Sequence, residues 1–305
     1  MPVVKVHRNI HLVDLKVAGI ENFIASYIVR GKRLAIVEAG PASTAQNLLA
    51  GLNEVSISLE DVAYIAVSHI HLDHCGASGA LLKSLPNAKL IVHKRGAPHV
   101  ANPDRLWAQA KQILASTAEI YGEPSPVPRD RIIIGVEGMT FNLGRGVHLN
   151  VVETLGHASH HLSYYETSSQ GIFTGDAAGI YLSRIDTIVP TIPPPYRLDV
   201  ASNALRKLMS LNPTSLYYTH FGKADNATKR LQLYLTQLEL WAESAKRGLE
   251  KGEDLNSIRR RILRNDPALQ EAAEYIRKHP ILSKTVLNHS VKGIINYVEN
   301  MNSSI

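Results

Sequence analysis

The stretch SHIHLDH at residues 68–74 follows directly on the apolar run Val62–Val67. Successive side chains of a β-strand point to opposite faces, so His69 and His71 would share one face where this strand ends. By chance, an H-x-H-x-D-H pattern is expected in only roughly one in a thousand chains of this length and composition. A polar loop of this kind can curl around a cation. Its candidate ligands are His69, His71, Asp73 and His74.

Three further polar clusters also stand where short apolar runs end. They are Gly156-His157 after Val147–Val152, Gly175-Asp176 after Gly171–Thr174, and Thr219-His220 after Ser215–Tyr218. Each cluster alone is weak evidence, because a histidine or a Gly-Asp pair at the end of a strand is common. If the strands end at one edge of a sheet, however, all four clusters meet at one site. Imidazoles and carboxylates suit Zn²⁺ best and also iron or manganese.

Short runs rich in Val, Ile and Tyr alternate with helical patterns, which predicts a layered α/β (α+β) fold. The expected strands are Val3–Val6, Phe23–Val29, Leu34–Val37, Val62–Val67, Leu90–His93, Ile132–Val136, Val147–Val152, Leu162–Tyr165, Gly171–Thr174 and Ser215–Tyr218. The expected helices among them are Ser43–Leu52, Ala77–Leu85, Leu106–Ile120 and Val200–Leu211.

The pattern changes from Lys223 onward. Apolar residues between Leu231 and Leu249 recur every three or four positions, which is typical of one face of a long helix. Shorter helical patterns follow over Leu255–Leu263, Ala268–Arg277 and Lys284–Val298. We therefore expect a catalytic domain over residues 1–222 and a helical C-terminal extension over residues 223–305. The extension could cover the site, form a homodimer or only cap the core.

Composition excludes several classes of protein. Apolar residues make up 45% of the 305 residues and charged residues 20%, which is too apolar for a disordered chain. A single cysteine, Cys75, excludes an internal disulfide framework and reads as a small buried residue. No apolar run approaches the ~20 residues that span a bilayer, and no signal-peptide core follows Met1. We expect a soluble cytoplasmic protein with no membrane association.

Together the four clusters resemble the metallo-β-lactamase superfamily, and within it the branch of glyoxalase II and the lactonases. The resemblance covers about residues 20–222 and implies a four-layer αβ/βα sandwich with two divalent metal ions at one edge. It implies that the first ion is bound by His69, His71 and His157. It implies that the second ion is bound by Asp73, His74 and His220, with Asp176 bridging the pair.

Three features depart from the family pattern. Glu38 stands where the family usually has Asp, and we expect it to contact a metal-binding side chain, together with Thr219. The second motif reads Gly-His-Ala-Ser-His-His, in which His160 and His161 have no ligand role and are expected to pack or to contact substrate. The basic C-terminal pattern with which glyoxalase II binds glutathione is missing.

The family chemistry implies hydrolysis of an ester-like bond in a lactone, thioester or other carboxylic ester by a hydroxide that bridges the two metals. Asp73 would orient this hydroxide and take its proton. Substrate residues are expected in the loops, where Tyr181 is a candidate proton donor to the leaving group. The other two pocket candidates are Arg184 and Tyr196.

Two alternative functions stay open. Relatives with similar ligands cleave phosphodiesters, and the chain carries a net charge of +6 and an arginine cluster at Arg259–Arg261. That cluster is more typical of the solvated face of a helix, so we expect a small-molecule substrate rather than nucleic acid. Other relatives use one iron to oxidise a persulfide, but the full set of ligands for two metals argues against this chemistry.

Overall fold

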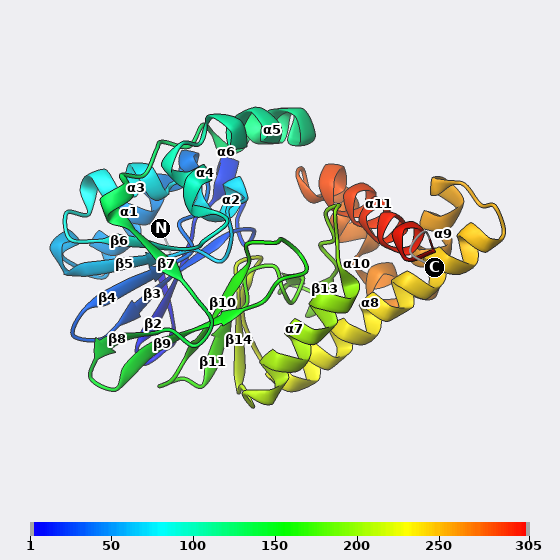
Figure 1. Ribbon diagram of the computed structural model, residues 1–305. Helices are drawn as coiled ribbons and strands as arrows, with labels where there is room; N and C mark the ends of the chain where they lie inside the picture. Colours follow the sequence, from blue (N-terminus) through cyan, green and yellow to red (C-terminus); the bar gives the residue numbers. More distant parts are fainter. Residues whose placement is uncertain (1–2, 303–305) are drawn as a thin grey trace.

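The computed structural model describes residues 3–302, apart from the side chains of residues 284–287 and 302. Two β-sheets lie face to face between two layers of helices (Figure 1). The first sheet has the order β1-β2-β3-β4-β5-β6-β7, with bounds Val3–His7, Ile10–Asp14, Ala25–Arg30, Leu34–Val37, Val62–Ala66, Lys89–His93 and Ile132–Gly135. The αβ/βα arrangement confirms the predicted fold class.

The second sheet has the order β15-β14-β11-β10-β9-β8. In that order its strands are Gly222–Asp225, Ser215–Tyr218, Gly171–Phe173, Leu162–Glu166, Val147–Glu153 and Thr140–Gly144. A separate hairpin pairs β12 (Ile180–Leu182) with β13 (Thr187–Val189). In the first sheet β1 to β4 pair antiparallel, whereas β4 to β7 run parallel, so β4 and β5 end at the same edge.

Successive side chains of a strand point to opposite faces of the first sheet, and each face packs into its own apolar core. In β3, Tyr27 and Val29 point between the two sheets, where they meet residues such as Phe173 and Tyr217 of the second sheet. Ile28, between them in the sequence, belongs to the core under the helices. Both faces of the sheet are therefore covered, which explains why its strands read as nearly continuous apolar runs.

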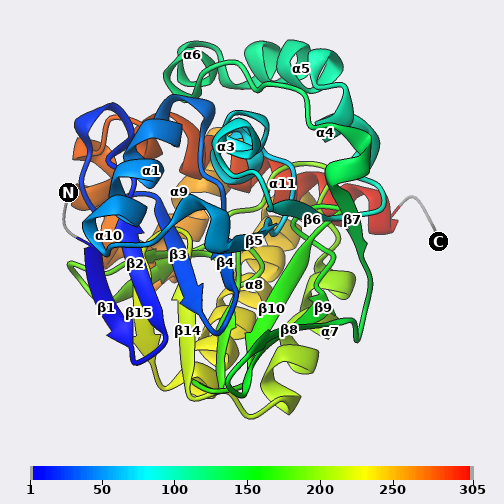
Figure 2. The ribbon, with the colours of Figure 1, turned by 90° about the vertical axis from the view of Figure 1, so that its left-hand side faces the viewer.

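Helices cover the outer face of each sheet (Figures 1 and 2). On the first sheet lie α1 (Ala45–Glu54), α2 (Leu72–Cys75), α3 (Ser78–Ser84), α4 (Ala97–Ala101), α5 (Asp104–Leu114) and α6 (Ser116–Tyr121). On the second lie α7 (Leu198–Ser210) and α8 (Ala227–Glu250). The predicted single helix Leu106–Ile120 is wrong: Ala115, with φ of 48° and ψ of −124°, leaves the helical conformation and separates α5 from α6.

The helical extension confirms the predicted change of pattern. Within the predicted range 223–305, residues 223–225 belong to β15 of the second sheet, and the helices begin with α8 at Ala227. They continue with α9 (Leu255–Asn265), α10 (Pro267–Lys278) and α11 (Leu282–Asn302). The central polar contact of the extension is Asp266, which is 1% exposed and begins α10 by accepting a hydrogen bond from the backbone N–H of Leu269. The same carboxylate accepts bonds from Trp241 Nε1 at 2.6 Å and Gln237 Nε2 at 2.9 Å, which fastens α10 to α8.

No helix within residues 3–302 is both long and apolar enough to cross a membrane.

Replacing Asp266 with alanine is expected to lower the free energy of unfolding by about 2–4 kcal/mol, because two buried donors lose their acceptor. The matched control is Asp254→Ala, which removes only the exposed cap of α9 on Ser257 and should cost about 1 kcal/mol. Urea unfolding followed by tryptophan fluorescence measures both losses. Equal losses in the two variants would contradict the inference that Asp266 holds α10 against α8.

Candidate metal centre

Five strands end at one edge of the sandwich, and the segment after each strand carries a polar side chain into the same place. Glu38 follows β4, and His69 to His74 follow β5 through the start of α2. His157, Asp176 and His220 follow β9, β11 and β14. The structure thus brings together the four clusters that the sequence places at strand ends.

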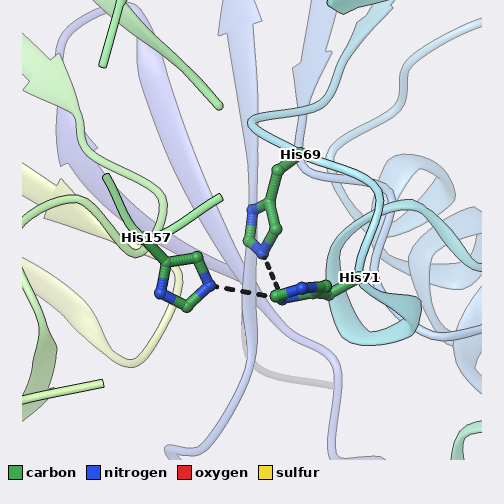
Figure 3. A group of neighbouring side chains, drawn as sticks. All are labelled: His69, His71 and His157. Carbon is green, nitrogen blue, oxygen red and sulfur yellow. Dashed lines mark hydrogen bonds between the residues drawn. The ribbon is translucent and has the colours of Figure 1, made fainter. Parts of the chain in front are cut away.

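Three imidazoles converge in the first group, drawn in Figure 3. Nε2 of His69 lies 2.8 Å from Nδ1 of His71, and Nε2 of His157 lies 3.2 Å from the same atom. His71 Nδ1 carries at most one hydrogen, which can serve only one of its two neighbours at a time. One nitrogen atom from each ring lies within 4.8 Å of the other two, so the three imidazoles could hold a metal ion.

The second group consists of Asp73, His74 and His220. Oδ2 of Asp73 lies 3.4 Å from Nε2 of His220 and 3.9 Å from Nε2 of His74. His74 is fully buried and His220 is 4% exposed, whereas 18% of the Asp73 side chain is exposed. Asp73 is therefore a carboxylate that both faces the group and meets solvent.

Asp176 stands between the two groups. Its Oδ2 lies 3.4 Å from His157 Nε2, and its Oδ1 lies 3.3 Å from His74 Nε2 and 3.8 Å from His220 Nε2. Among the described residues, neither Asp176 Oδ1 nor His74 Nε2 has a hydrogen-bond partner, although both atoms are buried. Unpaired buried atoms of this kind are costly unless something else satisfies them. Bound metal would satisfy both atoms, so these residues fit a metal site.

Backbone carbonyls fix two of the histidines from behind. Nδ1 of His157 donates to the carbonyl of Thr191 at 3.1 Å, and Nδ1 of His220 donates to the carbonyl of Phe23 at 3.0 Å. With Nδ1 protonated, Nε2 of each ring presents a lone pair to the centre, which is how metal-binding histidines are usually oriented.

The helical extension braces both of these carbonyl segments. Ser290 of α11 donates to the carbonyl of Pro190 at 3.1 Å and accepts from the N–H of Ile192 at 3.1 Å, one residue on either side of Thr191. The ring of His279, after α10, packs on Phe23 with centroids 4.6 Å apart.

Glu38 lies behind His74. Its Oε2 is 3.4 Å from His74 Nδ1 and also accepts the N–H of Ser68 at 3.4 Å, while the hydroxyl of Thr219 donates to Oε1 at 3.3 Å. Glu38 therefore contacts the candidate ligand His74, and Thr219 contacts Glu38. Neither residue belongs to a candidate ligand group itself. Glu38 adopts a φ of 68°, so its backbone is held in the left-handed region to bring the carboxylate there.

His161 supports Asp176 through a chain of hydrogen bonds that sequence reasoning missed. The hydroxyl of Ser163 donates to the carbonyl of Thr174 at 3.2 Å, Thr154 donates to Ser163 at 2.8 Å, and His161 Nδ1 donates to Thr154 at 2.8 Å. Since the carbonyl can only accept, these directions are fixed. Nε2 of His161 is left to accept the backbone N–H of Asp176 at 3.2 Å.

Burial and neighbouring charges shift the pKa values of the candidate ligands away from their ordinary values. Burial, followed by His157, lowers the pKa of His71 to about 3, and burial lowers the pKa of His69 well below its ordinary value. For Asp73 burial acts to raise the pKa, but His74 and His220 outweigh it and hold the pKa at about 2. For Asp176 burial acts the same way, but His74 and His157 keep its pKa well below the usual range. Both carboxylates are thus ionised at neutral pH and require positive charge beside them.

The three residues predicted to contact substrate lie in different surroundings. The hydroxyl of Tyr181, in β12, donates to Asp186 at 2.6 Å, and burial raises the pKa of Tyr181 to about 12. Arg184 is exposed in the turn between β12 and β13, and Tyr196 is buried in the main core at 4% exposure. With its hydroxyl committed to Asp186, Tyr181 is a poor donor to a leaving group. Cys75 is buried, as expected, and belongs to none of the candidate ligand groups.

Comparisons with known proteins agree with this geometry. The sequence profile of the metallo-beta-lactamase superfamily matches residues 20–220. The metallo-beta-lactamase fold-containing protein ST1585 of Sulfurisphaera tokodaii is 26% identical over 262 residues, which cover 84% of this chain and 92% of that protein. The probable metallo-hydrolase YqjP of Bacillus subtilis is 23% identical over 216 residues, or 64% of this chain and 66% of that one.

Solved structures show the same fold. The structure of ST1585 aligns with a TM-score of 0.65 at 24% identity and covers 76% of this chain and 86% of that one. TTHA1429, a metallo-beta-lactamase family protein of Thermus thermophilus, aligns with a TM-score of 0.68 at 17% identity over 98% of this chain and 95% of that one. These findings do not single out the glyoxalase II and lactonase branch. They do establish that the chain belongs to the metallo-β-lactamase superfamily.

Proposed function

We propose that the protein is a dinuclear metallohydrolase, with zinc as the metal, that cleaves an ester-like bond of a small-molecule substrate. The observation that carries the proposal is the position of Asp176, whose two oxygens face two separate groups of imidazoles. The name of YqjP, a probable metallo-hydrolase, supports the same class of reaction. The ester class rests on the resemblance of the motifs to the lactonase branch.

The grouping of the candidate ligands supports a site for two ions. The first ion would be held by His69, His71 and His157, and the second by Asp73, His74 and His220, with Asp176 shared between them. Divalent ions at such a site lower the pKa of water toward neutrality and polarise the bond to be cleaved. Five imidazoles and two carboxylates suit Zn²⁺, while iron and manganese are compatible with the same donors.

Asp73 is the residue we assign to proton transfer. Its side chain is 18% exposed, so it can contact both a water molecule and a bound substrate. Its Oδ2 lies 3.4 Å from His220 Nε2, which fixes the direction in which the carboxylate points. A carboxylate so placed can orient the attacking water and accept its proton.

Asp73→Ala is expected to bind about one zinc ion instead of two and to lose at least about 100-fold in turnover of the best ester substrate. The matched control is His148→Ala, which removes a partly buried histidine that contacts Thr167 away from the centre. Elemental analysis gives zinc per chain and ester hydrolysis gives turnover. Full zinc content and parental turnover in Asp73→Ala would refute the assignment.

Glu38→Gln is expected to weaken the binding of one of the two zinc ions by about 10- to 100-fold, because His74 loses the carboxylate partner behind its ring. Gln keeps the length of the side chain and the backbone preference at this strained position. The control is Glu166→Gln, which changes a fully buried carboxylate that accepts the N–H groups of Ser168 and Ser169 instead. Calorimetric zinc titration should show the loss in the first variant only.

A panel of lactones, thioesters, simple carboxylic esters and phosphodiesters, tested on zinc-loaded protein, separates the reaction classes. We expect turnover of at least one of the three carbonyl classes and none of the phosphodiester. Turnover confined to the phosphodiester would overturn the ester assignment while leaving the dinuclear site standing.

A further inference from the structure

A cavity of about 440 Å³ opens at the edge of the sandwich opposite the candidate metal centre. The turn between β1 and β2, the turn between β3 and β4, and the turn between β8 and β9 form its walls. β4 and β5 begin beside this cavity and end at Val37 and Ala66, just before the residues of the candidate metal centre. A strand of four to six residues is about 13–20 Å long, so the cavity is separate from the proposed active site.

The cavity is lined by basic side chains from all three turns. Its five cations stand against one carboxylate, Asp61, so the formal sum is +5 − 1 = +4. The cations are Lys5, Arg8, Arg30, Lys32 and Arg145. More than half of the net charge of +6 thus lies around one hollow, although the chain as a whole is only mildly basic. Uncompensated charge in a concave surface concentrates anions.

The basic residues here lack the ion pairs made by similar residues elsewhere. Across the part of the chain that the structure describes, none of these five side chains has an ion pair or a hydrogen bond. By contrast, Lys207 pairs with Glu137 at 2.9 Å and Arg230 pairs with Asp186 at 2.7 Å. The donors of the five cavity side chains are therefore available to an anion from solution.

Backbone contacts hold the three turns in fixed relation. The N–H of Arg30 donates to the carbonyl of Asn9 at 2.8 Å, and the N–H of Lys32 donates to the carbonyl of Leu143 at 2.7 Å. Gly31 approaches Leu143 so closely that a Cβ there would overlap its carbonyl oxygen. Because the turns are tied together, the cations converge without a large loss of backbone freedom when a ligand binds.

His11 adds a polar group on the cavity wall. Its Nδ1 is buried and has no hydrogen-bond partner among the described residues. Burial, followed by the charge of Arg30, lowers the pKa of His11, so the ring is neutral at pH 7 and can donate one N–H.

We propose that this basic cavity is a second ligand site that binds a compact multivalent oxyanion of the di- or triphosphate class. The charge of the lining is about equal and opposite to that of such an anion, and the volume lies within the ~300–1,000 Å³ of ligand pockets. Three of the cations are arginines, whose forked N–H groups match phosphate oxygens in pairs. No Phe, Tyr or Trp lines the cavity, so a nucleobase would find no ring on which to stack.

The test is calorimetric titration of the zinc-loaded protein with tripolyphosphate at physiological salt. We expect saturable binding to one site, weakened at least about tenfold in Arg30→Glu/Arg145→Glu. The matched control is Arg259→Glu/Arg260→Glu, which makes the same change of charge on α9 and should keep parental affinity within about twofold. Arg30→Gln/Arg145→Gln, a milder change, should weaken binding in the same direction if the double glutamate variant folds poorly.

Zinc content and ester turnover are measured in the same samples, because tripolyphosphate can also strip metal. Loss of affinity in the cavity variant with unchanged zinc content assigns the binding to the cavity and leaves the active-site proposal unaffected. Equal affinity in the two double glutamate variants would overturn the proposal. So would tighter binding of a single-stranded RNA or an anionic vesicle that tripolyphosphate does not displace, because the ligand would then be a polyanionic surface.

Discussion

A buried carboxylate whose two oxygens face different imidazole groups is the constraint on which the rest of the structure depends. Asp176 is ionised and 5% exposed, and an ionised group so buried is costly unless positive charge surrounds it. The nitrogen atoms that face it come from segments after three different strands, β5, β9 and β14. Those strands must therefore end at one edge, and a two-sheet sandwich whose strands end together meets this requirement.

The second requirement is that the imidazoles keep their orientation. Backbone carbonyls hold His157 and His220 from behind, and the C-terminal helices support the segments that carry those carbonyls. The helical extension therefore supports the candidate metal centre through the segments that hold two of its histidines. Asp266 attaches α10 to α8, and a loose α10 would release His279 from Phe23.

Much of the site could be predicted because its side chains occur in short motifs directly after apolar runs. Contacts that depend on backbone atoms, or on residues brought together only by the fold, were not predicted. The carbonyls of Thr191 and Phe23 are backbone atoms that any residue could provide, and the role of His161 depends on Thr154 and Ser163 lying beside it. The short strands β2, β8, β12, β13 and β15 exist because a neighbouring strand pairs with them. The break between α5 and α6 falls at Ala115, where no glycine or proline predicts the end of a helix.

Anomalous diffraction from crystals of the zinc-loaded protein tests the central claim most directly. The account predicts two zinc peaks in each chain, one among His69, His71 and His157 and the other among Asp73, His74 and His220, with one oxygen of Asp176 toward each. A single peak at full zinc saturation, or a peak outside these two groups, would contradict it.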